Sequence, residues 1–218
     1  MDSKNSQISY RVLQLLLGII LALFLLFQLS NHAHAQRIGG ACEGCEGVYE
    51  YGQQVLTATD TFPEFEQHQS QLYVTGTVFQ ADGQTPAAGV ILYAYHTNRE
   101  GIYPKKGNEK GMARRHGYLR AWVKTNANGQ YSFYTFKPGS YPSRTEPAHI
   151  HLIVKEPGLD EYWIDSIEFE DDPLLTATMR EGKRQRGGNG IVRLRTKGGM
   201  LLAQRDIVLG KNIPNYTR

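Results

Sequence analysis

Cysteine is almost absent from this chain of 218 residues, and the only two, Cys42 and Cys45, lie far from its paired histidines. That position argues against a sulfur-rich zinc centre around those histidines. Charge of one sign is also in little excess, because the formal net charge is +3. No stretch interleaves arginine with aromatic residues, so the sequence lacks the footprint of a nucleic-acid-binding protein. Nucleic acid is therefore excluded as a partner.

Helical periodicity is nowhere clear in the chain. Residues 72–79 and 89–95 instead read as two strands that flank a turn at residues 81–83. Strand, turn and strand at short spacing predict an all-β fold, a β-sandwich of mostly antiparallel strands. Without its first residues the chain has roughly 180 left, enough for one domain with a sizeable core.

A long apolar run occurs only near the start, over residues 12–29, after Lys4 and Arg11. Residues 33–35 read Ala-His-Ala, a pattern typical of a cleavage site, and predict that residues 1–36 are a signal peptide. The run is close to membrane-spanning length, so an uncleaved anchor that would associate the protein with a membrane is the competing interpretation. Either way the sequence predicts export to the periplasm, the cell envelope or the medium.

The remaining chain divides into an N-terminal arm over residues 37–70 and a sandwich domain over residues 71–218. The arm contains the C-x-x-C pair Cys42 and Cys45 in a glycine-rich stretch. No thioredoxin-like helix follows the pair, and exported proteins keep their disulfides. We therefore predict a local disulfide rather than a redox motif.

Two histidines, His149 and His151, stand two residues apart in a stretch rich in β-branched residues. Alternate side chains of a strand share one face, so both imidazoles point the same way and Ile150 points the other way. The apolar residues after the pair indicate an interior strand, where polar side chains need a partner or a metal. The pair is thus a candidate for two metal ligands.

Two further residues are candidates to complete such a site. Glu156 follows His151 at the spacing of the cupin pattern, but the glycines that this pattern expects nearby are Ser143 and Trp163 here. Tyr141 lies in a Pro-Gly turn just before the histidines, and phenolate is a hard donor that suits ferric iron.

Residues 129–144 read G-x-Y-x-F-x-T-x-x-P-G-x-Y-P-x-R, and P-A-H-I-H follows. This combination resembles the core signature of the intradiol ring-cleavage dioxygenases, the catechol and protocatechuate 3,4-dioxygenase family. The resemblance implies a β-sandwich that holds one non-haem Fe(III) on two histidines and two tyrosines. Carried over, the ligands are His149, His151 and Tyr141, with Tyr103 as the second tyrosine.

The choice of Tyr103 rests on the run Asn98-x-x-Gly-x-Tyr103, which resembles the segment that supplies the other iron tyrosine in this family. Tyr118 and Tyr131 are its rivals, and each is explained by packing next to or within a predicted strand.

The same resemblance implies the reaction: a catechol-type diol and O2 give a muconate-type diacid, with Tyr141 acting as both ligand and acid-base group. The sequence leaves open the oligomeric state, a homo-oligomer included.

Two positions depart from the pattern of the family. Glu146 stands where an arginine usually precedes Pro-Ala-His-x-His, and Ser166 stands where a glutamine is common. A carboxylate in place of a cation reverses a local charge in a site of low dielectric constant. The alternative interpretation is therefore an exported, transthyretin-like accessory or binding module that has lost catalysis.

Overall fold

The structure, a computed structural model, describes residues 16–20 and 37–217. Contacts divide the chain into a unit of residues 1–36 and a unit of residues 37–218. Residues 16–20 are helical, and no helix among the described residues is both long and apolar enough to span a bilayer. The rest of the predicted leader lies outside the described residues, so its cleavage stays a prediction.

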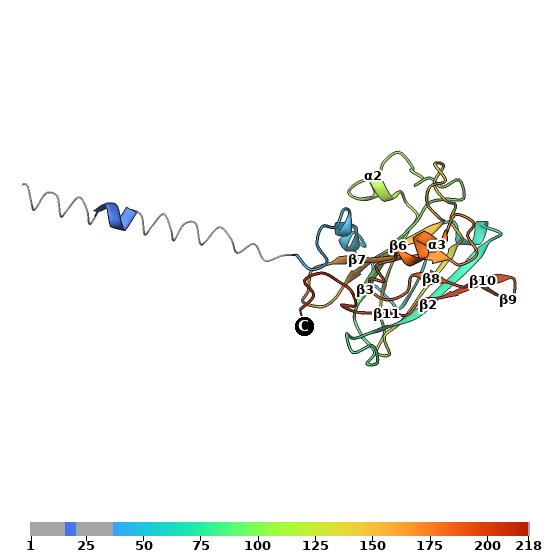
Figure 1. The fold of residues 1–218 in the computed structure, drawn as a ribbon. Helices are drawn as coiled ribbons and strands as arrows, with labels where there is room; N and C mark the ends of the chain where they lie inside the picture. The colour runs from blue at the N-terminus through green and yellow to red at the C-terminus, as the bar shows by residue number, and fades with distance from the viewer. Residues whose placement is uncertain (1–15, 21–36, 218) are drawn as a thin grey trace, which may run out of the picture. The chain divides into compact units, whose positions relative to one another are not determined.

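The second unit is built from two β-sheets (Figure 1). In the first sheet the strand order is β1, β5, β2, β10, β9, and β11 also pairs with β2. These strands span β1 Thr59–Thr61, β2 Gln71–Phe79, β5 Gln130–Phe136, β9 Arg195–Lys197, β10 Met200–Gln204 and β11 Ile207–Val208.

The second sheet has the order β4, β3, β6, β7, β8. Its central strands pair antiparallel, and parallel pairing is confined to short contacts of β1, β8, β10 and β11. The all-β prediction is confirmed. The strands span β3 Ile91–Tyr95, β4 Arg120–Lys124, β6 His149–Lys155, β7 Tyr162–Phe169 and β8 Ile191–Val192.

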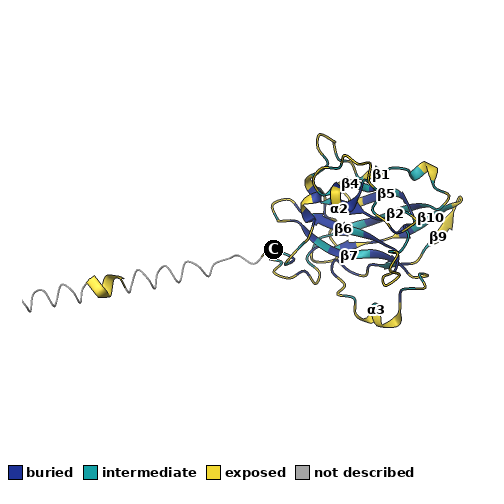
Figure 2. Cartoon of the chain, turned by 90° about the horizontal axis from the view of Figure 1, so that it is seen from above, coloured by how far each residue is buried: buried dark blue, intermediate teal, exposed yellow. Residues whose placement is uncertain are grey.

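The main core lies between the two sheets, as the dark strands of Figure 2 show. Along β2 buried residues alternate with partly exposed ones, as a strand with one covered face requires. The helical segments are short and peripheral to this core (Figure 1). They are the 3₁₀ helices η1 Cys45–Tyr49 and η2 Phe65–Gln67, and the α-helices α2 Ala113–His116 and α3 Ala177–Glu181.

A smaller apolar cluster covers the outer face of the second sheet. Val48 of η1 is fully buried there against Tyr93, Trp122 and Ile153. A disulfide joins Cys42 to Cys45 and ties the start of η1 to the preceding loop, as predicted. The part of the N-terminal arm around η1 therefore forms a second layer over the sheet that carries His149 and His151, while β1, later in the arm, joins the first sheet.

One buried histidine makes stability depend on pH. His96 is fully buried, donates from Nδ1 to Thr97 O at 2.7 Å, and has Thr135 Oγ1 2.6 Å from Nε2. Burial lowers the pKa of His96 to about 4. As pH falls from about 6.5 toward 4, only the unfolded chain takes up this proton, and the free energy of unfolding should fall by about 3 kcal/mol.

Urea unfolding at pH 7 and at pH 5 measures about 2 kcal/mol of this loss, because the fall is complete only near pH 4. His116, whose pKa burial also lowers to about 4, adds to it in the same direction. A His96→Asn variant should be less stable at pH 7 but lose less between the two pH values. An equal loss in both proteins would show that His96 does not contribute.

Candidate metal and substrate site

The two histidines of the sequence motif begin β6 and face away from the main core. His149 and His151 lie on the outer face, with their Nε2 atoms 3.0 Å apart, while Ile150 packs between the sheets. The strand is interior, because β3 and β7 pair with its two edges. The alternation read from the sequence is therefore confirmed.

A β-bulge in β7 lies beside His151. Two residues of β7 oppose this single residue of β6, so the strands change register there. The bulge brings Ser166 next to the imidazole, with Ser166 Oγ 3.4 Å from His151 Nδ1. Bulges near active sites commonly re-aim a side chain in this way. Ser166, noted in the sequence as a departure, thus supports a candidate ligand.

The two candidate tyrosines sit on loops that pack backbone against backbone. Gly101 has φ +76°, and a Cβ there would lie 1.9 Å from Ser140 O. Gly139 approaches the other loop equally closely. Tyr103 and Tyr141 each follow one of these glycines by two residues. Glycine at both positions therefore lets the phenols meet.

The four residues predicted as ligands converge at one point. His151 Nε2 lies 2.9 Å from Tyr103 Oη, 3.3 Å from Tyr141 Oη and 3.0 Å from His149 Nε2. The two phenol oxygens are 2.6 Å apart. Donors bound at about 2.0–2.1 Å to one first-row metal lie about 3 Å from each other. The spacing of the donor atoms therefore fits a single small cation.

The electrostatics of the cluster favour neutral side chains without a cation. Burial, the Tyr141 hydroxyl and the carboxylate of Glu146 raise the pKa of Tyr103. Burial raises the pKa of Tyr141 as well, with Glu146 adding to the effect. Burial and His149 hold the pKa of His151 well below its usual range. Two phenols in such a place ionise only when a strong positive charge binds them.

The orientation of His149 leaves its Nε2 free for a metal. Its Nδ1 lies 2.8 Å from Pro147 O, and because a carbonyl only accepts, Nδ1 carries the proton. A hydrogen bond of this kind fixes the tautomer of metal-binding histidines in general.

The rival tyrosines are engaged elsewhere. Tyr118 donates to Glu64, and Tyr131 is buried in the main core, where its hydroxyl donates to Arg205 O at 2.6 Å. Packing explains both residues, as the sequence indicated.

The cupin-like alternative also fails on position. Glu156 is fully buried just beyond the opposite end of β6, where it accepts from Tyr162 Oη at 2.6 Å. Within residues 16–20 and 37–217, no third histidine, cysteine or carboxylate joins His149 and His151 in a metal-binding group. The remaining donors at this point are phenols.

Tyr95 is a site residue that the sequence reasoning missed. Its ring is stacked between His151, at 4.5 Å between centroids, and His116, at 3.8 Å. The signal was present in β3, because Tyr93 and Tyr95 alternate with the core residue Ala94 and pair across the sheet with β6. Without the strand register, nothing in the sequence linked Tyr95 to His151.

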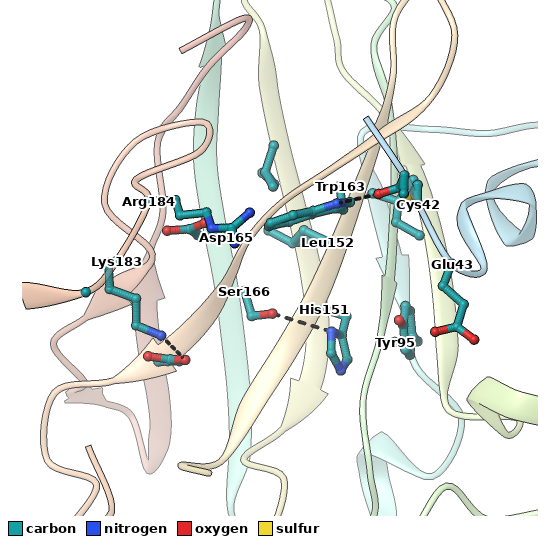
Figure 3. Close-up of a pocket in the computed structure, with 15 residues that line it drawn as sticks. Cys42, Glu43, Tyr95, His151, Leu152, Trp163, Asp165, Ser166, Lys183 and Arg184 are labelled. Atoms are coloured by element: carbon teal, nitrogen blue, oxygen red, sulfur yellow. Dashed lines mark hydrogen bonds and ion pairs between the residues drawn. The ribbon is translucent and has the colours of Figure 1, made fainter. Parts of the chain in front are cut away.

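A cavity of about 610 Å³ opens beside His151, which is the one candidate ligand that lines it (Figure 3). Tyr95, His151 and Ser166 line one part of it, and Trp163 lies farther along β7. The disulfide loop contributes Cys42 and Glu43, and the segment after α3 contributes further charged side chains. Pockets that bind small organic molecules commonly measure about 300–1,000 Å³. The volume is therefore sufficient for an aromatic substrate.

The comparisons with known proteins agree with this geometry. A family model described as Dioxygenase matches residues 50–197. The chain is 29% identical over 111 residues to the beta chain of protocatechuate 3,4-dioxygenase from Burkholderia cepacia, covering 48% of this chain and 47% of that protein. It is 29% identical over 120 residues to catechol 1,2-dioxygenase 1 from Acinetobacter lwoffii, covering 48% and 37%. The match thus spans less than half the length of these relatives.

Solved structures share the fold. Catechol 1,2-dioxygenase from Acinetobacter radioresistens aligns with a TM-score of 0.52 at 18% identity, covering 72% of this chain and 59% of that one. An intradiol ring-cleavage dioxygenase from Tetranychus urticae aligns with a TM-score of 0.52 at 20% identity, covering 79% and 93%. At these identities the likeness concerns the fold alone.

Proposed function

Because this chain belongs to the intradiol ring-cleavage dioxygenase family, we propose that it cleaves a catechol-type diol with O2 between the two hydroxyl-bearing carbons. The product would be a muconate-type diacid. The observation that carries this proposal is the convergence of two phenols and two imidazoles, of which His151 also lines a cavity of substrate size.

The proposed metal is a non-haem Fe(III), and its ligands would be Tyr103, Tyr141, His149 and His151. When bound, ferric iron would supply Lewis-acid binding of both diol hydroxyls and activate the ring toward O2. Two phenolates and two neutral imidazoles suit its charge, because they cancel two of its three positive charges and leave one for a catecholate.

The protein's own residues supply the proton chemistry and the positioning. Tyr141 lies in the turn before β6, and we assign it the role of accepting a diol proton. Pro147 O and Ser166 Oγ hold the two imidazoles by their Nδ1 atoms. Tyr95 stacks on His151 and closes that side of the site.

A second candidate function is a binding module without catalysis, and Glu146 favours it. This exposed carboxylate faces both phenols closely enough to raise their pKa values, which opposes their ionisation and the binding of an anionic substrate. We therefore expect Glu146, which stands where the family pattern has an arginine, to change the rate and the choice of substrate. The four donor residues are retained.

Iron loading and oxygen uptake distinguish these candidates. The protein produced in iron-replete cells should hold about one iron per chain and be reddish, because tyrosinate bound to Fe(III) absorbs in the visible region. It should consume one O2 for each catechol cleaved, and the diacid can be identified by mass spectrometry. Coloured, iron-loaded protein that cleaves no diol from a broad panel would favour the binding module, and colourless, iron-free protein would refute the proposed metal.

A further inference from the structure

The two candidate histidine ligands are not held equally firmly. His149 has the carbonyl of Pro147 at 2.8 Å from its Nδ1, within the usual range of a hydrogen bond. His151 has Ser166 Oγ at 3.4 Å from its Nδ1, which is longer than that range. A metal-binding imidazole needs further contacts that fix the orientation of its ring. For His151 these contacts come mainly from the face of the ring.

A stack of aromatic rings supplies the contact with this face. Tyr95 lies beside His151 in Figure 3, with 4.5 Å between the ring centroids and 15° between the planes. Tyr95 also stacks on His116, at 3.8 Å and 6°. His116 is buried, and its Nδ1 lies 2.8 Å from Tyr93 Oη. The orientation of His151 therefore depends on side chains that are not among the four donors.

The disulfide loop packs against the far end of this stack. A Cβ at Gly44, which lies between the two cysteines, would be 2.5 Å from His116 Nε2, so only the bare backbone of glycine fits there. Cys45 is fully buried in the apolar cluster on this face of the sheet. Its disulfide with Cys42 closes the loop. The bridge thus holds in place the backbone that supports His116.

Resting on the proposed metal site, we propose that the disulfide loop positions the ligand His151 through His116 and Tyr95, and so sets how tightly the site holds its cation. His116 and Tyr95 are then positioning residues, because they act on the ring of His151 and not on the metal. Loss of the bridge between Cys42 and Cys45 should accordingly weaken metal binding, although no ligand is changed.

Gly44→Ala tests this path without removing any side chain. The added methyl group would push His116 against Tyr95. The affinity for Fe(III), measured in competition with citrate, should therefore fall by about 10–100-fold, as is common when groups that orient metal ligands are changed. Gly40→Ala is the matched control. Gly40 has φ +71°, against +82° for Gly44, and a Cβ there would meet nothing within 4 Å. This control should bear the same backbone strain and keep the affinity of the parent protein.

Three further variants separate the ring from the bridge. Tyr95→Phe keeps the stacked ring and should bind iron as the parent protein does, whereas Tyr95→Leu removes the flat face and should lose affinity as Gly44→Ala does. The double variant Cys42→Ser and Cys45→Ser should lose affinity in the same direction. Urea unfolding of the iron-free proteins measures the stability of each variant separately from its affinity for iron.

The outcomes distinguish this proposal from the proposed function. A parent affinity in folded Gly44→Ala, or equal affinities in Tyr95→Phe and Tyr95→Leu, would overturn the positioning role while leaving the metal site intact. If Gly44→Ala fails to fold, the two variants of Tyr95 decide the matter alone. A parent protein that binds no iron would refute the proposed metal itself.

Discussion

Replacing both Tyr103 and Tyr141 by phenylalanine is expected to abolish the visible absorption of the iron-loaded protein and to lower kcat/KM for catechol by more than about a hundredfold. Their hydroxyls lie 2.6 Å apart and within 3.3 Å of His151 Nε2. Changes to groups that only orient metal ligands commonly cost 10–100-fold in affinity or activity. Loss of two proposed ligands should exceed that range.

Single substitutions separate the roles of the two phenols. Tyr103→Phe and Tyr141→Phe should each shift and weaken the visible band, because one phenolate remains. Only Tyr141→Phe should also change the pH dependence of kcat, since Tyr141 is proposed to accept the proton of the diol. The measurements are absorption spectra at a fixed iron content and steady-state oxygen uptake from pH 6 to pH 9.

Tyr118→Phe is the matched control for these variants. Tyr118 belongs to the same part of the chain, but its hydroxyl bonds Glu64 rather than the cluster. Its variant should keep both the colour and the rate. A double variant of Tyr103 and Tyr141 that retained the parent spectrum would refute the proposed ligand set.

Gly101→Ala is expected to destabilise the protein by about 2–5 kcal/mol and to reduce its iron content. Two costs add in this variant. Alanine at φ +76° is strained by about 1–2 kcal/mol, and its Cβ would lie 1.9 Å from Ser140 O, an overlap that typically costs about 1–3 kcal/mol. Relief of the overlap must move the loop of Tyr103 away from the turn of Tyr141, and this separates the phenols.

Gly107→Ala isolates the first cost. Gly107 has φ +94°, and an added Cβ would meet nothing within 4 Å. This variant should lose only the strain energy and should bind iron normally. Thermal unfolding and iron analysis of the two variants, side by side, measure both effects. Equal losses of stability with full iron in both would show that the contact between the loops does not hold the phenols together.

Much of the fold and part of the site follow from local patterns. The alternation along residues 72–79 places Leu72, Val74 and Val78 in the core, as β2 shows. The same period of two puts His149 and His151 on one face, because the geometry of an extended backbone fixes where alternate side chains point. The Pro-Gly turn before β6 likewise locates Tyr141.

Other features could not be read from local patterns. Local alternation placed Tyr95 on the face opposite Ala94, but nothing in the sequence linked it to His151, because that contact depends on the register of β3 against β6. From the sequence, Ser166 was only a departure from the glutamine that is common at this position. In the structure, a β-bulge brings its hydroxyl to His151. Bulges and registers arise from packing among strands distant in the chain, which no short motif records.

By itself, the sequence determined that two imidazoles share one side of an interior strand, since covalent geometry leaves an extended chain no other arrangement. Only the tertiary structure decided that Tyr103, 48 residues before His151, reaches the same point, and that a disulfide loop, β7 and the segment after α3 enclose the cavity beside it. The reason is physical: closing long loops costs entropy, and here the burial of two apolar layers and the close approach of two glycines must offset that cost.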